Sequence, residues 1–214
     1  GEQIAFRSGR GGGGIFVMGA TGESVRRLTN LGHNPAWSPD GVWIAFYTYT
    51  DNGICMVHPD GSAAGAFSAG TQHLAGSYMD WSPDSQKLVY RSGRDGKTGI
   101  WISNRDDSGH TLVTNNGSDS FPAWSPDGTR IAFAATRNGN QDIYVMNSDG
   151  SGVTRLTEAF GADRWPSWSP DGERIIFYGS RGGRMHLFSV SPEGGEVSEV
   201  PGSAENEISP AFSP

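Results

Sequence analysis

The chain has 214 residues, a formal net charge of −7 and a pI near 5.1, with 32 Gly, 12 Pro and 18% charged residues. Because Cys55 is the only cysteine, an internal disulfide and a multi-cysteine metal site are excluded, and the scattered Lys and Arg residues of this acidic chain give no electrostatic reason to expect nucleic acid. No stretch approaches the roughly 20 apolar residues of a membrane span and no signal peptide stands at Gly1, so a cytosolic protein and the mature part of an exported one would both have this composition.

The first predicted elements are two strands, residues 4–6 and 15–18, joined by a Gly-rich segment. Gly9, Gly11 and Gly14 in this segment spell G-x-G-x-x-G, the pattern of a dinucleotide-binding turn. That turn works because a helix N-terminus receives the pyrophosphate, whereas here a second strand follows. We therefore interpret the segment as the loop of a β-hairpin, and we expect no cofactor.

A phrase that begins at Trp37, W-S-P-D-G, recurs through the rest of the chain. Its aromatic residue returns at steps of 44, 43, 44 and 44 residues, at Trp37, Trp81, Trp124, Trp168 and Phe212. Periods of roughly 40 to 50 residues are typical of propellers and helical arrays. No segment has helical apolar spacing, whereas each unit contains short β-type runs separated by Gly, Asp and Pro, so the repeat predicts propeller blades of four strands.

Each unit has the same predicted order of elements. The innermost strand ends in Trp-Ser, Pro-Asp-Gly forms a type I turn with Pro at its second and Gly at its fourth position, and a second strand follows. After a variable loop comes a third strand, predicted at residues 15–18, 54–57, 100–103, 143–147 and 185–190. A second turn, clearest at 59–61 and 148–150, leads to an outer strand, seen at 26–29 and 155–157.

The two ends of the chain are predicted to complete one blade. Residues 212–214 supply the strand-and-turn piece that the blade beginning at Gly1 lacks. Pairing of the C-terminal inner strand with the N-terminal strands would close the ring and remove exposed sheet edges. We therefore expect residues 1–214 to form a single all-β domain, a five-bladed β-propeller of four-stranded antiparallel blades, present as a monomer or as part of a larger chain.

The repeat resembles that of a known family. W-S-P-D-G-x-x-I-A-F, followed by S-x-R, I-Y-V-M-N-x-D-G-S and R-L-T, is similar to the β-propeller repeat of the TolB type, and residues 124–157 match it almost throughout. The resemblance covers essentially the whole chain and implies a propeller fold. TolB is a periplasmic protein that binds other envelope proteins, so the resemblance also implies a protein-interaction platform and a periplasmic or extracellular location.

The chain departs from TolB in two respects, since the TolB propeller has six blades and stands beside a separate N-terminal domain. Similar repeats also occur in the propellers of prolyl-oligopeptidase-like peptidases and in modules attached to polysaccharide-degrading enzymes. Because a shared fold does not carry activity from one protein to another, function has to be sought at the positions that differ between the blades.

The variable positions are expected at one end of the propeller, opposite the Pro-Asp-Gly turns. Residues three before each repeat aromatic, and residues just after each second strand, should surround the mouth of the central channel. Their mixture of aromatic rings and Arg donors suits sugar rings or an extended peptide with apolar side chains, while a plug of aromatic side chains that binds nothing is the alternative. The candidate ligand-binding residues are Asn34, Tyr47, Tyr78, Asp80, Arg91, Phe121, Trp165 and Tyr178.

Asp80 stands where the other units have Ala36, Ala123, Ser167 and Ala211. A carboxylate at this tight inner-strand position should be partly desolvated, so it should find an Arg or backbone N–H donors, or hold a raised pKa. Two interpretations remain open for Asp80, a structural ion pair and a ligand-binding or acid–base role.

Other polar residues either recur in the repeat or lack a ligand pattern. Arg10, Arg94, Arg137 and Arg181 recur at one position of the units, which predicts hydrogen bonds or ion pairs from blade to blade. The five His residues never stand at metal-ligand spacing, so no metal site is predicted.

Three functions remain open at this point. The first is a non-enzymatic module that binds a glycan or an extended peptide at the channel mouth, and the second is a TolB-like platform for protein interaction. The third is a glycosidase, which would need two carboxyl groups roughly 5 Å or roughly 6.5 to 9.5 Å apart. Since no deep substrate cleft is evident, we expect no catalytic residues. The carboxylates near the mouth that could serve such an enzyme are Asp80, Asp119, Asp163, Glu205 and Glu207.

Overall fold

The computed structural model describes residues 2–48, 53–62, 65–68, 78–158 and 160–201. These residues form five antiparallel sheets in which each strand pairs with a strand next to it in the chain. The first sheet holds β1 (Gln3–Arg7), β2 (Ile15–Gly19) and β3 (Arg26–Arg27), and the second holds β4 (His33–Trp37), β5 (Ile44–Thr48), β6 (Gly53–Val57) and β7 (Gly65–Ser68). The third sheet holds β8 (Met79–Trp81), β9 (Lys87–Ser92), β10 (Gly99–Asn104) and β11 (Thr111–Leu112). The fourth holds β12 (Ser120–Trp124), β13 (Arg130–Thr136), β14 (Gln141–Asn147) and β15 (Thr154–Arg155), and the fifth holds β16 (Asp163–Trp168), β17 (Ile175–Arg181), β18 (Arg184–Val190) and β19 (Ser198–Glu199).

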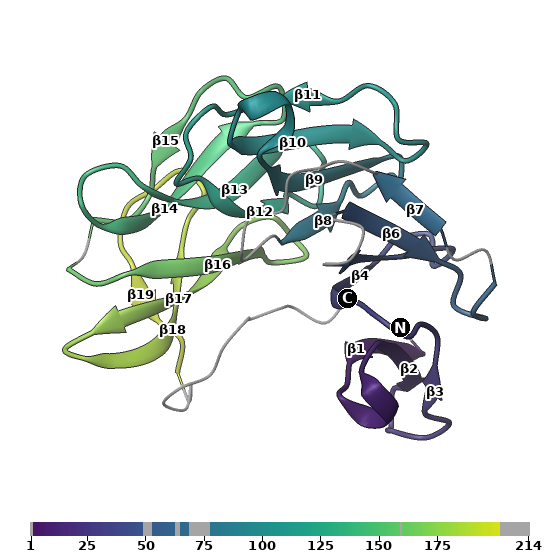
Figure 1. Ribbon diagram of the computed structural model, residues 1–214. Helices are drawn as coiled ribbons and strands as arrows, with labels where there is room; N and C mark the ends of the chain where they lie inside the picture. Colours follow the sequence, from purple (N-terminus) through teal and green to yellow (C-terminus); the bar gives the residue numbers. More distant parts are fainter. Residues whose placement is uncertain (1, 49–52, 63–64, 69–77, 159, 202–214) are drawn as a thin grey trace.

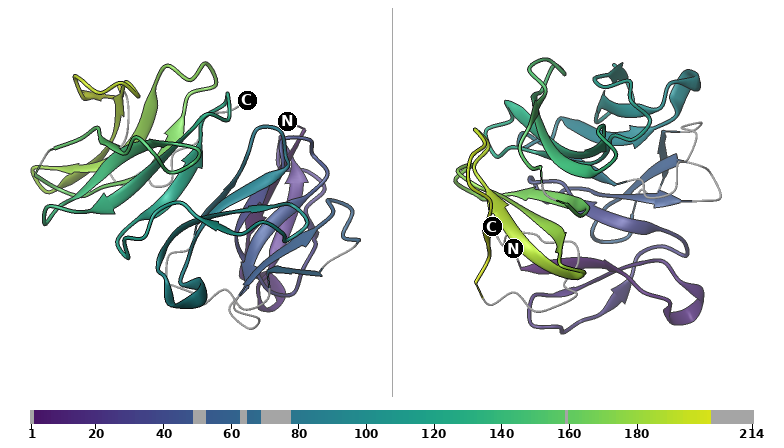
Figure 2. Two further views of the ribbon diagram at one scale, coloured as in Figure 1. Left: turned by 90° about the horizontal axis from the view of Figure 1, so that it is seen from above. Right: turned by 90° about the vertical axis from the view of Figure 1, so that its left-hand side faces the viewer.

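The five sheets follow one another around a common centre in chain order, from β1 to β19 (Figure 1). The first strands of four sheets, β4, β8, β12 and β16, lie side by side around this centre. Figure 2 shows that neighbouring sheets turn their broad faces toward each other. The short 3-10 helices η1 (Arg10–Gly12) and η2 (Arg94–Gly96) lie in the β1–β2 and β9–β10 loops. The architecture is a five-bladed β-propeller, as the repeat predicts.

Hydrophobic side chains fill the space between neighbouring blades. In β13, Ile131 and Phe133 pack against the third blade, whereas Ala132 and Ala134 pack against the fifth. Successive side chains of a strand point to opposite faces, and here both faces are covered, so the strand is a continuous apolar run rather than an alternating one. The core is therefore divided into layers between blades, and each blade is stabilised by its neighbours.

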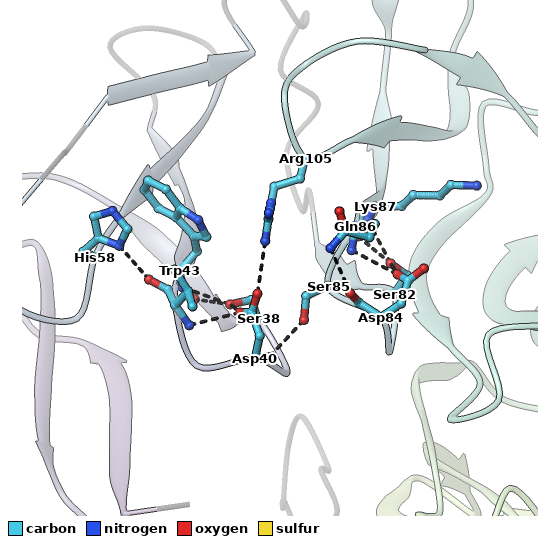
Figure 3. Close-up of polar contacts among 11 residues, drawn as sticks. Ser38, Asp40, Trp43, His58, Ser82, Asp84, Ser85, Gln86, Lys87 and Arg105 are labelled. Carbon is cyan, nitrogen blue, oxygen red and sulfur yellow. Dashed lines mark hydrogen bonds and ion pairs between the residues drawn. The ribbon is translucent and has the colours of Figure 1, made fainter.

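The W-S-P-D turns close one end of blades two to five, and those of blades two and three contact each other. The N–H of Gly41 donates to the Ser38 carbonyl at 2.8 Å, which is the hydrogen bond of a β-turn, and Ser38 Oγ donates to the Asp40 carboxylate at 2.5 Å. Across to the third blade, the Asp40 N–H donates to Ser85 Oγ at 2.9 Å and Arg105 donates to the Asp40 carboxylate at 3.0 Å (Figure 3). Ser85 holds a φ of 60° where the equivalent turns have glycine.

The tryptophans of the repeat connect neighbouring inner strands. Trp81 Nε1 donates to the Ala36 carbonyl and Trp168 Nε1 to the Ala123 carbonyl, each at 3.1 Å. In both cases the acceptor is the residue before the tryptophan of the preceding blade. These residues recur because they build the blades.

The structure confirms the predicted order of elements and differs from it at the first blade. The third strands begin and end within two residues of their predicted bounds, whereas the outer strands are only two residues long in most blades. Among the described residues the first blade has three strands, β1 to β3, rather than four. The predicted closing strand falls in residues 202–214, which lie outside the described residues, as do Glu205 and Glu207, two of the carboxylates expected near the mouth.

Candidate functional site

Three inner strands share one irregularity at the end opposite the W-S-P-D-G turns. The pairing of β4, β12 and β16 with the strand that follows each of them contains one extra residue, a β-bulge. Within these bulges Asn34, Phe121 and Trp165 hold φ angles of 49°, 55° and 51°. Positive φ is uncommon outside glycine and costs on the order of 1–3 kcal/mol. The strained backbone therefore lies at the positions from which the sequence predicts ligand contact.

Proline is the feature of the sequence that marks these bulges. Pro35, Pro122 and Pro166 directly follow the three residues with positive φ. Proline lacks the N–H that a regular ladder requires, so in sheets it is found at edges and bulges. The third blade has Met79 instead of proline, and β8 pairs regularly with β9 from Met79 to Trp81.

The bulged aromatic residues form one cluster with their neighbours. The ring centroids of Tyr78 and Phe121 are 4.7 Å apart, those of Phe121 and Trp165 are 5.4 Å apart, and those of Tyr78 and Trp165 are 6.4 Å apart. Tyr178 extends the cluster, with its ring centroid 5.7 Å from that of Trp165. Tyr78, Phe121 and Trp165 come from three consecutive blades and are half-buried, whereas Tyr178 is only 3% exposed. Aromatic rings from three blades therefore lie in contact at the mouth of the central channel.

A small cavity lies against this aromatic cluster. Its volume is about 190 Å³, and Asp80 is the one charged residue among the described residues that line it. Trp165 also lines the cavity, and its buried indole Nε1 finds no acceptor among the described residues. The lining comes from the inner strands of blades three, four and five: Tyr78, Met79, Asp80, Phe121, Pro122, Ala123, Trp165, Pro166 and Ser167.

The Asp80 carboxylate bridges two blades. Oδ1 accepts the N–H of Trp81 at 2.9 Å, and Oδ2 accepts the N–H of Trp124 on β12 at 2.8 Å. In the same blade pair the indole Nε1 of Trp124 has no partner among the described residues, whereas Trp81 and Trp168 donate theirs to a carbonyl of the preceding blade. Trp124 therefore lacks the indole hydrogen bond that Trp81 and Trp168 make, and Asp80 instead accepts its backbone N–H.

Burial raises the pKa of Asp80 to about 6, although the two backbone N–H donors act in the opposite direction. Desolvation disfavours the charged form, and no basic group of the described residues contributes to the pKa of Asp80. Of the three alternatives expected from the sequence, Asp80 has the backbone donors and the raised pKa, and no Arg of the described residues pairs with it.

The remaining candidate residues lie at different depths. Asn34 is exposed on β4, and Tyr47 is 4% exposed within the core between blades two and three. Arg91 is half-buried on β9, where its guanidinium donates to the carbonyls of Gly117 and Asp119 at 2.8 and 3.1 Å. Tyr47, Arg91 and Tyr178 all lie within the second strand of their blades rather than just after it.

The recurring arginines form ion pairs inside a blade rather than between blades. Arg137 donates to Asp119 at 2.9 Å, and Arg181 to Asp163 at 2.7 Å, in each case within one blade. Both carboxylates have no exposed side-chain surface. Burial nevertheless raises the pKa of Asp119, against the effects of Thr114 and Arg137. The blade-to-blade prediction was therefore wrong for Arg137 and Arg181, because the acceptor lies on the loop or inner strand of the same sheet.

Two further features of the structure concern metal sites and membrane-spanning helices. In the part of the chain that the structure describes, no group of three His, Cys, Asp or Glu side chains is arranged to bind a metal ion. Among the same residues, no helix has the length and apolar character needed to cross a membrane.

Comparison with known proteins gives the family of the repeat. The model of the TolB β-propeller domain family matches residues 55–214, and no curated protein matches the sequence. The solved structure of a putative TolB from Agrobacterium tumefaciens is 27% identical with a TM-score of 0.75, over 85% of this chain and 66% of that one.

Two further structures are similar in fold alone. TolB from Acinetobacter baumannii is 19% identical with a TM-score of 0.81, over 98% of this chain and 54% of that one. An oligogalacturonate lyase from Vibrio parahaemolyticus is 15% identical with a TM-score of 0.70, over 94% of this chain and 62% of that one. The chain thus spans 54 to 66% of the length of the two TolB structures.

Proposed function

Since the chain belongs to the TolB β-propeller domain family, we propose that it is a non-enzymatic binding module that holds an extended segment of a protein partner at the mouth of its channel. The observation that carries this proposal is the pair of bulges at Phe121 and Trp165, where a strained backbone places two bulky rings against Tyr78. Strain of this kind clusters at ligand sites. A periplasmic or extracellular location is part of the same proposal, because the resemblance to TolB implies it.

The chemistry of the mouth supports an extended peptide as the ligand. Half-buried aromatic rings offer large apolar contact area at low entropic cost, and such residues dominate binding energy in protein interfaces. The unpartnered Nε1 of Trp165 would add a donor for a backbone carbonyl of the ligand.

The ion pairs support a role without catalysis. Asp119 and Asp163, two of the carboxylates that a glycosidase could use, are fully buried and bound to Arg137 and Arg181. A carboxylate held in this way is engaged by its arginine and is not exposed to a substrate in the channel.

The test is selection of a random peptide library on the folded chain, followed by affinity measurement of the selected peptides. We expect Trp165→Ala to weaken binding by at least about tenfold, since a central aromatic anchor is removed. Trp43→Ala is the matched control, because Trp43 is also a half-buried tryptophan but stacks on His58 at the opposite end of the blade. Selected peptides that bind Trp165→Ala as tightly as the unchanged chain would contradict the proposal.

A glycan is the second candidate ligand of the same mouth. The cluster of Tyr78, Phe121 and Trp165 favours it, since sugar rings stack on aromatic side chains, and one protein of similar fold is named an oligogalacturonate lyase. Saturable quenching of tryptophan fluorescence by a soluble polysaccharide, lost in Trp165→Ala, would support the glycan. A flat response across plant and bacterial polysaccharides would leave the peptide as the ligand.

A further inference from the structure

We propose that the cavity beside Asp80 is a pocket for one basic side chain of the bound segment, with arginine fitting it best. This inference rests on the proposed function and adds the chemistry of the ligand. It follows from three features of the cavity: a carboxylate without a cation, aromatic rings around it, and a volume suited to a single side chain.

The carboxylate of Asp80 has room for further donors. Each of its oxygens accepts one backbone N–H, from Trp81 and Trp124, and a carboxylate oxygen can accept two hydrogen bonds. No Lys, Arg or His of the described residues forms an ion pair with Asp80 or lines the cavity. A partly desolvated charge without a counter-ion is costly, and a cation brought by a ligand would remove that cost.

The aromatic rings that share the cavity favour the same ligand. Tyr78, Phe121 and Trp165 line it together with Asp80. The faces of aromatic rings attract cations, and the planar guanidinium of arginine stacks on them while it donates hydrogen bonds to a carboxylate. A cation that enters this cavity therefore meets aromatic rings and a carboxylate at once.

The size of the cavity limits what enters it. Its volume of about 190 Å³ lies below the roughly 300–1,000 Å³ of sites that enclose a whole small molecule. One side chain of a longer segment therefore fits, while the rest of the segment lies over the aromatic cluster.

The arginines of the same face are directed elsewhere. Arg137 and Arg181 are paired with Asp119 and Asp163, and Arg91 donates to backbone carbonyls. Arg164 donates to Gln141 at 2.6 Å. These contacts hold the guanidinium groups away from Asp80 and leave its carboxylate for the ligand.

The test compares two blocked peptides, Gly-Gly-Arg-Gly-Gly and the same peptide with citrulline in place of arginine, by titration calorimetry. Citrulline has the shape of arginine but no charge. We expect the arginine peptide to bind at least about tenfold more tightly to the unchanged chain, which corresponds to one charge-assisted contact.

Two variants of Asp80 connect the preference to this residue. Asp80→Ala introduces the residue that the second and fourth blades carry at this position, Ala36 and Ala123, so the fold tolerates it. Asp80→Asn keeps the shape of the side chain without its charge. Both variants should lower the affinity for the arginine peptide to that for the citrulline peptide and leave the affinity for the citrulline peptide unchanged.

The outcomes separate this inference from the proposed function. Equal binding of the two peptides, weakened by Trp165→Ala, would overturn the arginine pocket and leave the channel mouth as a peptide site. An arginine preference that survives in Asp80→Ala would also overturn it. If neither peptide binds, the pocket is overturned, and the selected library peptides then decide the proposed function on their own.

Discussion

At the scale of single residues, Asp80 is the clearest departure from the repeat. The second, fourth and fifth blades have Ala36, Ala123 and Ser167 at this position, which shows that the inner strand folds without a carboxylate. Burial disfavours the charged form of this carboxylate, so at neutral pH its desolvation offsets what the hydrogen bonds to Trp81 and Trp124 contribute. The presence of a carboxylate in the cavity beside the aromatic cluster is therefore better explained by ligand binding than by a contribution to stability.

The first prediction is that Asp80→Ala gains stability relative to the unchanged chain as the pH rises from 4 to 7. Because the pKa of Asp80 is raised from 3.8 to about 6 in the folded state, the folded chain binds more protons than the unfolded chain between these values. The free energy of unfolding contributed by Asp80 therefore falls as pH rises through this window, by on the order of 3 kcal/mol, and stays low above it.

Urea unfolding of both proteins between pH 4 and pH 7.5 measures this effect. We expect the variant to gain stability relative to the unchanged chain as the pH increases, and the gain to level off above about pH 7. The difference between the two proteins isolates Asp80 from the other titrating groups. A difference that does not change with pH would show that the carboxyl group of Asp80 is not desolvated.

At the scale of elements, the buried ion pairs connect the start of an inner strand with the end of the second strand. Arg137 reaches Asp119 and also lies over the ring of Tyr144, 4.9 Å from its centroid. Arg181 reaches Asp163 and lies over the ring of Phe188 at 4.5 Å. These contacts fix the loops that present the channel mouth, so the arginines position the site without contacting a ligand.

The second prediction is that Arg137→Ala destabilises the fourth blade strongly. It leaves the fully buried Asp119 carboxylate without its cation, which costs about 3–5 kcal/mol when a buried pair is broken from one side. Arg94→Ala is the matched control from the third blade, where the partner Asp95 is 75% exposed at 4.0 Å, and it should cost less than about 1 kcal/mol. Denaturant unfolding of both variants makes the comparison, and equal losses would contradict it.

The sequence predicts the elements well and their side-chain partners less well. Its repeat identifies the W-S-P-D-G turns, the strand order and the channel-mouth position of Tyr78, Phe121 and Trp165, because these depend on local chemistry and on period. The pairing of Arg137 with Asp119 depends on how a variable loop folds back on its own sheet, and no local pattern records this. The place of Tyr47 in the repeat predicts a position at the mouth, but the pleat of β5 turns its side chain into the core between blades two and three.

At the scale of the whole molecule, the contact between inner strands leads to a testable prediction about the ring. Trp81 and Trp168 donate Nε1 to the residue before the tryptophan of the preceding blade. The buried Nε1 atoms of Trp37 and Trp124 have no such acceptor among the described residues, and for Trp37 the preceding inner strand itself lies outside them. In a closed ring the equivalent residue is Ala211, in the segment beyond the described residues. The repeat therefore predicts Ala211, which lies outside the described residues, as the acceptor for Trp37 in a closed ring.

The third prediction tests this contact with a double-mutant cycle. Deleting residues 208–214 should lower the melting temperature by several degrees, at about 2–4 °C per kcal/mol lost in a chain of this size. Trp37→Phe should cost about 1 kcal/mol in the full chain and nothing further in the truncated one, since the same hydrogen bond is already lost. Trp81→Phe, which loses a bond to Ala36, should cost the same in both backgrounds. Additive losses for Trp37→Phe would rule out the contact.

The measurement that tests the central claim most directly is an NMR titration of the chain with a library-selected peptide, followed through the indole N–H resonances of its tryptophans. Each resonance reports one place in the propeller, with Trp165 at the channel mouth and Trp43 at the turns of the opposite end. If the mouth is the binding site, the Trp165 resonance shifts in a saturable manner and the Trp43 resonance stays in place. A peptide that shifts Trp43 and leaves Trp165 unchanged would contradict a binding site at the channel mouth.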